Sequence, residues 1–212
     1  MYNQFFKRFL DIILSMTALL LLIPLFLLIS LLIKLDSKGP VFFKQARVGK
    51  DRKEFYILKF RSMKVDAPQN MPTSLLTNPE QHITKLGKFL RKSSLDELPQ
   101  LVNIIKGDMS IVGPRPVIRD EKALIIKREH YGVYKVKPGL TGLAQVNGRD
   151  IISIKEKVAF DSEYVTNLSF LLDVKILVKT IINVIQSNGV HEGTQINSEN
   201  SIEPKQRVYR QS

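Results

Sequence analysis

The chain has 212 residues, no cysteine and a formal net charge of +12 at pH 7. This length buries one sizeable core, which predicts one domain with an attached segment and argues against a second full domain. The lack of cysteine excludes disulfides, thiolate catalysis and cysteine-based zinc sites, and the three histidines are too scattered for a metal-binding spacing. The charge predicts a polyanionic partner, with nucleic acid, anionic lipid and a phosphorylated substrate as the alternatives.

An uncharged apolar run from Ile12 to Ile33 would be roughly 33 Å long as a helix, enough to cross a bilayer core of about 30 Å. Pro24 lies at its middle and predicts a bend, because proline removes a helical hydrogen bond. Basic residues flank both ends, which places both ends on the cytoplasmic side. These features favour a re-entrant membrane helix over residues 1–36; a simple span is the alternative, since membrane helices tolerate proline. Arg8 and Asp11, three residues apart, are expected to form a local ion pair.

The residues after the apolar run predict a small domain with one β-hairpin and several helices. Residues 41–45 and 54–60 resemble short strands joined by the turn-rich VGKDRK. A mobile loop is expected at 65–79, which is mostly polar and contains three prolines. Helices are then expected at 83–92, about 95–106 with Gly107 as the stop, 121–129, 154–165 and 170–186.

The last of these helices has aliphatic residues on most of its faces. A buried core helix and a helix lying in the membrane interface both fit this pattern. The largely polar composition from Asn188 onward predicts disorder.

The segment SSLDELP, residues 93–99, contains two adjacent carboxylates, Asp96 and Glu97. Ser94 and Glu97 match the S-x-x-E capping box, which would place the pair in the first turn of a helix beginning at Leu95, where the helix dipole stabilises negative charge. If the helix instead begins at Pro99, the pair lies just outside it. In either case capping alone could account for both residues.

Several cationic residues surround this segment in the sequence. Arg115 lies between two prolines in a stiff loop suited to presenting a guanidinium to phosphate. Arg91 lies close upstream, and Lys59 and Arg61 occur in KFRSM. Each is individually explained as a solvated surface charge. Together with a membrane anchor, they indicate a phosphorylated substrate handled at the bilayer surface.

Five motifs follow the proline-broken apolar segment in a fixed order: KFRSM (59–63), SLDELPQL (94–101), KGDMSIVGPRP (106–116), KPGLTGLAQVNGR (137–149) and FLLDVKIL (170–177). In this order they closely resemble the bacterial monotopic phosphoglycosyl transferases, also called initiating sugar transferases. The resemblance covers about residues 2–190. It departs at three positions: Ile23 replaces a frequent serine, Lys137 a common arginine and Leu143 a common tryptophan.

The patterns and the resemblance together imply an α-rich α+β fold. It comprises a re-entrant membrane helix (1–36), a cytosolic catalytic domain with a short β-hairpin and interfacial amphipathic helices (37–187), and a polar, disordered tail (188–212). The resemblance implies transfer of a phosphosugar from a UDP-sugar to polyprenol phosphate with release of UMP. This would be the first membrane step of bacterial glycan assembly, at the cytoplasmic face of the cell membrane.

By the same resemblance, Asp96 would be the nucleophile that attacks the sugar-bearing phosphorus, giving a covalent intermediate that polyprenol phosphate resolves. Glu97 would be its partner, as general base or positioning group. Mg²⁺ bound by Asp96 and the diphosphate would reduce the repulsion between the two anions. The candidate phosphate-binding or substrate-binding residues are Lys59, Arg61, Arg91, Arg115, Lys137 and Arg149.

The expected partners are a UDP-sugar, polyprenol phosphate and an anionic lipid bilayer, with a homodimer open as an alternative to a monomer. Nucleic acid is not expected, because the chain has no tryptophan and many of its aromatic residues lie in apolar runs. The rival hypothesis is a membrane-tethered polyanion-binding or scaffold protein without catalysis. In that case Asp96 and Glu97 only cap a helix.

Overall fold

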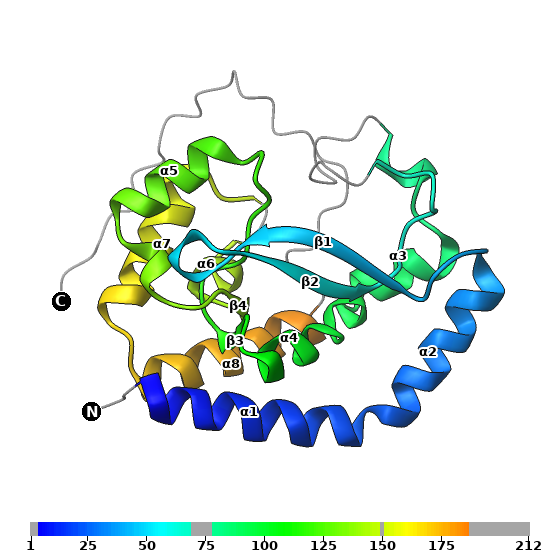
Figure 1. The fold of residues 1–212 in the computed structure, drawn as a ribbon, viewed down its shortest axis with the longest axis horizontal. Coiled ribbons are helices and arrows are strands. Elements are labelled where there is room, and N and C mark those ends of the chain that lie inside the picture. The colour runs from blue at the N-terminus through cyan, green and yellow to red at the C-terminus, as the bar shows by residue number, and fades with distance from the viewer. Residues whose placement is uncertain (1–3, 69–77, 149–150, 187–212) are drawn as a thin grey trace.

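The computed structural model describes residues 4–68, 78–148 and 151–186, which form two small sheets surrounded by helices (Figure 1). In chain order, with η for a one-turn 3-10 helix, the elements are α1 (Gln4–Leu21), α2 (Ile23–Asp36), β1 (Phe42–Val48), η1 (Lys50–Arg52), β2 (Glu54–Phe60), η3 (Pro79–Gln81), α3 (Lys85–Lys92), η4 (Leu95–Glu97), α4 (Gln100–Lys106), β3 (Ser110–Val112), α5 (Lys122–His130), η5 (Val133–Lys135), β4 (Gly139–Thr141), α6 (Leu143–Val146), α7 (Ile154–Thr166) and α8 (Phe170–Ile185).

This helix-rich order with one hairpin confirms those parts of the predicted fold class. The helices expected at 83–92, 121–129, 154–165 and 170–186 correspond to α3, α5, α7 and α8, with small differences at their ends. Gly107 ends α4 in the left-handed conformation, as a C-terminal glycine commonly does. Most of the loop expected at 65–79 and all of the predicted disordered tail fall outside the described residues.

The two N-terminal helices form a pair bent by 61° (Figure 1). The helix breaks at Leu22, and Pro24 lies in the first turn of α2. A proline is tolerated there because the N–H groups of a first turn have no partner within the helix. Among the described residues, no single helix is long and apolar enough to cross a bilayer, although the bent pair is when taken together. The chain therefore bends close to the predicted point, and insertion into a membrane stays a prediction.

Polar side chains of α1 attach this helix to the rest of the domain. Arg8 donates hydrogen bonds to the carbonyls of Ile104 and Ile105 at the end of α4. Asp11 accepts one from the backbone N–H of Ile111 in β3, at 3.0 Å. Each side chain thus binds the backbone of a distant element instead of forming the predicted Arg8–Asp11 ion pair. These contacts satisfy groups that a helix end and a short strand leave unpaired.

The hairpin presents one face of β1 and β2 to the rest of the domain. Phe43 pairs with Lys59, Gln45 with Ile57 and Arg47 with Phe55. Directly opposite residues of an antiparallel pair lie on the same face, so the side chains of Gln45, Arg47 and Lys59 are on one side of the ribbon. The hairpin confirms the prediction, with the first strand extended to Val48.

A second, unpredicted sheet consists of β3 and β4, which pair in parallel. The sheet joins the segment before Arg115 to the KPGLTG motif. Gly139 permits this approach, since a Cβ at that position would lie 2.1 Å from the backbone nitrogen of Gly113.

One apolar cluster of the core lies between β2 and α4. Phe55 and Ile57 pack with Leu101, Ile104 and Met109, and the burial of each such side chain stabilises the fold by about 1.5–3 kcal/mol. The buried Asn103 of α4 accepts a hydrogen bond from the N–H of Leu58 and donates one to the carbonyl of Tyr56. This amide fixes α4 against β2.

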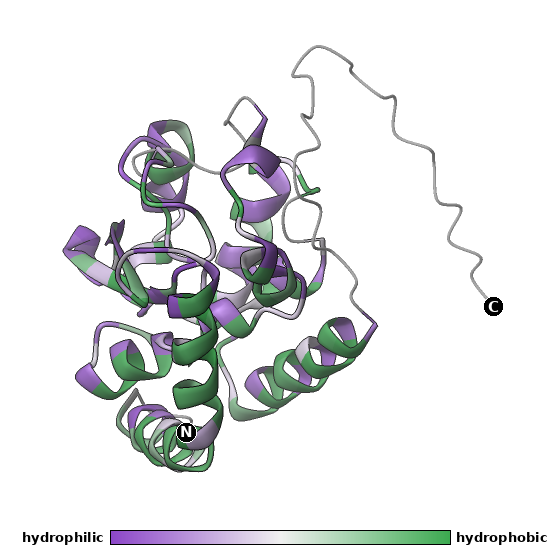
Figure 2. Ribbon diagram, turned by 90° about the vertical axis from the view of Figure 1, so that its right-hand side faces the viewer, coloured by the Kyte–Doolittle hydropathy of each residue, from purple (hydrophilic) through white to green (hydrophobic). Residues whose placement is uncertain are grey.

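Several helices leave apolar residues uncovered (Figure 2). The N-terminal helix pair and the helix that leads into the grey C-terminal trace are largely hydrophobic there. Exposed side chains include Leu20 and Leu21 on α1, Leu27, Leu31 and Leu35 on α2, and Leu171, Ile181 and Ile185 on α8. Because α8 exposes most of its aliphatic residues, it is not the buried core helix that was one of the two alternatives. Its exposure favours the membrane-interface alternative.

Gly87 lets α3 approach the segment that follows β2. A Cβ at this position would lie 1.9 Å from the carbonyl oxygen of Ser62, and a backbone oxygen cannot swing away as a flexible side chain can. We expect Gly87→Ala to destabilise the protein by about 1–3 kcal/mol or more, despite the gain of up to about 1 kcal/mol in helix propensity. Thermal unfolding in lipid nanodiscs measures this. Lys88→Ala, at the exposed next position, is the control, and an unchanged midpoint for Gly87→Ala would contradict the packing described.

Candidate active site

Asp96 and Glu97 lie in η4, between α3 and α4, and are only 8% and 7% exposed. The predicted capping box is wrong. Ser94 has a φ of 56° and its side chain makes no capping hydrogen bond, whereas a capping serine has an extended backbone. Pro99 precedes the first residue of α4, so the alternative that leaves the carboxylates just outside the α-helix is the correct one. Capping therefore does not account for the pair.

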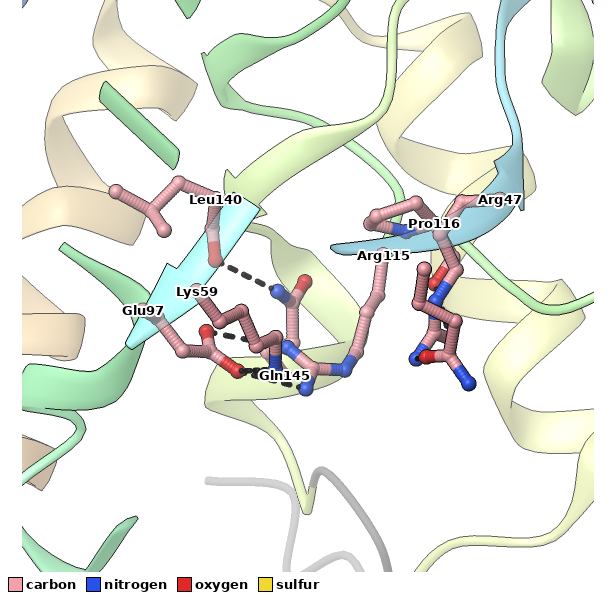
Figure 3. Close-up of polar contacts among 8 residues, drawn as sticks. Arg47, Lys59, Glu97, Arg115, Pro116, Leu140 and Gln145 are labelled. Carbon is pink, nitrogen blue, oxygen red and sulfur yellow. Dashed lines mark hydrogen bonds and ion pairs between the residues drawn. The ribbon is translucent and has the colours of Figure 1, made fainter. Parts of the chain in front are cut away.

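Glu97 binds two cations from different parts of the chain (Figure 3). Lys59 of β2 donates to its Oε1 at 2.8 Å, and Arg115, in the loop after β3, donates to the same oxygen at 2.9 Å. A second nitrogen of Arg115 lies 3.4 Å from Oε2. These charge-assisted bonds join the hairpin, η4 and the proline-flanked loop at one carboxylate.

Asp96 faces an open cleft that encloses about 890 Å³, part of it continuous with solvent. The cleft lies between the hairpin, the segment after β2, and α3 with η4. Its polar and charged lining residues are Gln45, Arg47, Lys59, Arg61, Ser62, Lys64, Arg91 and Asp96. Lys59, Arg61, Arg91 and Asp96 of the predicted site therefore line one cleft. Glu97 and Arg115 are not among the lining residues; they adjoin the cleft behind Lys59, which shares the carboxylate of Glu97 with Arg115.

The surroundings of Asp96 have opposing effects on its ionisation. Burial raises the pKa of Asp96, the charge of Lys59 opposes this most strongly, and the negative charge of Glu97 adds to the rise. Arg91 and Arg115 also favour the ionised form. Burial lowers the pKa of Lys59, and the charges of Glu97 and Asp96 oppose that change. The neighbouring cations thus oppose the effect of burial without cancelling it, and the pKa of Asp96 lies above its usual value.

Arg61 lines the cleft, but most of its guanidinium is used elsewhere. One terminal nitrogen, Nη2, donates to the carbonyl of Ser37 at 2.6 Å and to its hydroxyl at 2.9 Å, and the other, Nη1, donates to the carbonyl of Lys38 at 3.0 Å. Arg61 therefore holds the C-terminal end of α2 against the hairpin. Its predicted role in binding substrate stays untested.

Two other predicted residues are not brought to the cleft by the described structure. Lys137 is not among the lining residues; burial lowers its pKa, and its nearest charged neighbours include Arg8 and Asp11 of α1. Arg149 lies outside the described residues. The substrate-binding roles of both stay predictions.

Sequence reasoning missed a buried ion pair that supports Arg115. Arg128 of α5, 3% exposed, donates to Asp161 of α7 at 2.6 and 2.8 Å, and Asp161 is 1% exposed. Another nitrogen of Arg128 donates to the backbone carbonyl of Arg115 at 2.7 Å. Charged residues within helical patterns ordinarily face solvent, so the sequence carried no signal for this pair.

Gln45 and Arg47 also line the cleft and were not predicted as site residues. Here the sequence did carry a signal. Both lie on the same face of β1 as Phe43, which pairs with Lys59. Placing the turn correctly in the sequence would have given this pairing and shown that both residues lie on the same face as Lys59.

Comparison with known proteins gives one family and a consistent set of relatives. A family model described as "Bacterial sugar transferase" matches residues 2–187. The exopolysaccharide production protein ExoY of Sinorhizobium fredii is 41% identical over 197 residues, covering 86% of this chain and 87% of ExoY. The UDP-glucose:undecaprenyl-phosphate glucose-1-phosphate transferase of Escherichia coli is 44% identical over 186 residues, covering 84% of this chain and 40% of that protein. The UDP-galactose-lipid carrier transferase of Erwinia amylovora is 38% identical over 203 residues, covering 89% of this chain and 42% of that protein.

Proposed function

Because the chain belongs to the bacterial sugar transferase family, we propose that it transfers a phosphosugar from a UDP-sugar to polyprenol phosphate and releases UMP, in bacterial polysaccharide synthesis. Relatives whose names state this reaction for UDP-glucose and undecaprenyl phosphate support the proposal. The observation that carries it is the buried carboxylate of Asp96 in an open cleft, beside Lys59, Arg91 and Arg115. Such a site can bind a diphosphate and still supply a nucleophile.

In the proposed reaction, a carboxylate oxygen of Asp96 attacks the sugar-bearing phosphorus of the UDP-sugar. The bond from this phosphorus to the bridging oxygen breaks, and UMP leaves with the electron pair. A phosphate oxygen of polyprenol phosphate then attacks the same phosphorus, which frees the Asp96 carboxylate and gives a polyprenyl-diphosphate-linked sugar. Lys59, Arg91 and Arg115 stabilise the negative charge that develops on the transferred group.

Glu97 acts in this proposal as a positioning group. Its Oε1 accepts from both Lys59 and Arg115, so its lone pairs are largely occupied. A general base needs an oxygen within hydrogen-bond reach of the proton that it removes. The two ion pairs therefore favour positioning over proton transfer, and they hold the cations beside Asp96.

The residues present fit a Mg²⁺ ion held jointly with substrate. In the described part of the chain, no three His, Cys, Asp or Glu side chains gather into a metal-binding group. Mg²⁺ commonly uses one or two carboxylates together with substrate phosphates. Asp96 would supply a carboxylate ligand, and the diphosphate of the substrate would supply oxygen ligands that do not come from the protein. When bound, the ion would neutralise charge on the diphosphate and on the leaving UMP.

The exposed apolar surfaces of α1, α2 and α8 support a location at the cell membrane. The 61° bend fits a re-entrant pair whose two ends lie on the cytoplasmic side, where polyprenol phosphate would meet the nucleotide sugar. The homodimer stays a prediction.

The pH dependence of UMP release is expected to follow the ionisation of Asp96. Glu97→Gln removes a charge that raises the pKa of Asp96, so the acid limb of the remaining activity should move to lower pH. Lys59→Gln removes the charge that most lowers this pKa, so the limb should move to higher pH. Profiles of kcat/KM report the free enzyme and measure both shifts. Lys88→Gln, on the exposed side of α3, is the control, and limbs that move in the same direction would contradict the assignment.

The proposed function is tested by UMP release from UDP-glucose, UDP-galactose and UDP-N-acetylglucosamine. The full chain is supplied in nanodiscs with polyprenol phosphate and Mg²⁺. Repeated turnover, measured as steady-state UMP release, should require a UDP-sugar and the lipid phosphate, and EDTA should suppress it. If folded protein releases UMP from none of these sugars, the proposed reaction loses its support and the non-catalytic scaffold alternative gains. The sugar that turns over identifies the donor.

A further inference from the structure

Arg47 and Lys59 both line the cleft, at different points along the hairpin. The partner of Arg47 across the hairpin is Phe55, four residues before Lys59, a separation of about 13 Å along a strand. Figure 3 shows Arg115 between the Lys59–Glu97 pair and Arg47. Lys59, Arg115 and Arg47 therefore follow one another in space instead of surrounding one point.

The guanidinium of Arg47 is held by two neutral oxygens. It donates to the side-chain oxygen of Gln45 at 2.6 Å and to the carbonyl of Pro116 at 3.2 Å. A guanidinium has five N–H donors, so three are left over, and the buried Nε has no partner among the described residues. Lys59 and Arg115, by contrast, share the carboxylate of Glu97. Within the described chain, Arg47 is thus a cleft cation without a directly bonded carboxylate.

The charge of Arg47 is costly in the absence of an anion. Burial and the nearby charge of Arg115 lower the pKa of Arg47 to about 10, against weaker opposing effects of Glu121 and Glu97. The side chain is therefore still cationic at neutral pH. A second guanidinium close by, in a partly desolvated cleft, creates a potential that an anionic group would relieve.

The direction of the proposed reaction indicates which anion this is. In phosphoryl transfer the attacking and leaving oxygens lie roughly in line with the phosphorus. With Asp96 as the attacking group, the leaving UMP points away from Asp96 along the cleft. Arg47 lines the cleft on the β1 side, and Arg115 lies between it and the Lys59–Glu97 pair (Figure 3).

We propose that Arg47 binds the phosphate of the UMP part of the UDP-sugar, with Gln45 holding the guanidinium in place. This assignment rests on the proposed function and adds a nucleotide-binding residue to it. Arg47 would contact the group that leaves, whereas Lys59 and Arg91 would contact the group that is transferred.

Binding of UMP, measured by calorimetry on the full chain in nanodiscs, tests this without any turnover. Arg47→Gln should weaken UMP binding by roughly 10- to 100-fold, the loss expected for a charge-assisted hydrogen bond. Lys44→Gln is the matched control, because it removes one positive charge from the exposed face of the same strand. Arg47→Lys should bind UMP with intermediate affinity, since it keeps the charge and loses the planar fork.

Three outcomes would overturn the assignment. The first is a folded Arg47→Gln protein whose affinity for UMP is within about twofold of wild type. The second is a Lys44→Gln protein that loses as much affinity for UMP as Arg47→Gln does, which would indicate a general electrostatic effect. The third is no additional loss when Arg47→Gln is combined with Arg115→Gln, which would mean that Arg47 acts only through the Pro116 loop. If Arg47→Gln does not fold, Arg47→Lys takes its place in these measurements, and the same three outcomes would overturn the assignment. Failure of wild type to bind UMP would instead count against the proposed function itself.

Discussion

Asp96→Asn is expected to lower UMP release by about a thousand-fold or more, because an amide oxygen is a poor nucleophile and removal of a catalytic nucleophile typically has effects of this size. The substitution keeps the size of the side chain and replaces a charge that burial already disfavours, so the protein should stay folded. Initial rates of UMP release at saturating UDP-sugar measure the loss. Asp120→Asn, at an exposed aspartate before α5, is the matched control and should retain full activity.

The same pair of proteins tests the covalent intermediate. Without polyprenol phosphate, wild type should exchange labelled UMP into the UDP-sugar, because the first step is reversible and does not need the lipid acceptor. Asp96→Asn should show no exchange. Turnover without exchange in wild type would indicate direct transfer between the substrates. An Asp96→Asn protein that keeps a tenth or more of wild-type activity would remove Asp96 from the nucleophile role.

Arg128→Met is expected to have the largest effect on stability, about 3–5 kcal/mol, because it leaves the carboxylate of Asp161 buried without its partner. It also removes the hydrogen bond to the backbone of Arg115, so UMP release should fall in the fraction that remains folded. Thermal unfolding in nanodiscs and the rate per folded molecule measure the two effects.

Two further variants separate this prediction from a general loss of charge. Arg119→Met breaks a pair with Glu54 in which both side chains are well exposed, and it should change stability by no more than about 1 kcal/mol. The double variant Arg128→Met with Asp161→Leu replaces both charges with apolar groups and should recover much of the stability. A single variant as stable as wild type, or a double variant that recovers nothing, would contradict the argument.

Much of the secondary structure could be predicted, because the hairpin and the longer helices have clear periodic patterns. The short parallel sheet could not, since strands of three residues such as Ser110–Val112 carry no measurable periodicity. The capping box at Ser94 failed for a different reason. Its spacing is correct, but the backbone there is left-handed and Glu97 binds Lys59 and Arg115, so tertiary ion pairs override a local pattern.

Some residues of the candidate site could be assigned from the sequence and others could not. Asp96, Lys59 and Arg115 could be assigned because they occur in motifs whose order is specific. Arg61 occurs in the same motif as Lys59, but the motif does not record that its guanidinium binds Ser37 at the end of α2, because that contact depends on how α2 packs against the hairpin. Arg128 and Asp161 could not be anticipated, because burial of an ion pair depends on how α5 and α7 pack and no local pattern records it.

The polar contacts of α1 restrict the ways in which this helix can change. Lys7 binds Asp173 of α8 at 2.6 Å, and Arg8 and Asp11 bind α4 and β3. One residue inserted between Arg8 and Asp11 would rotate everything beyond it by about 100° and shift it by about 1.5 Å, so only one set of contacts could be kept. The rotational register of α1 is therefore as fixed as that of a strand in a sheet, although none of its described residues lines the cleft.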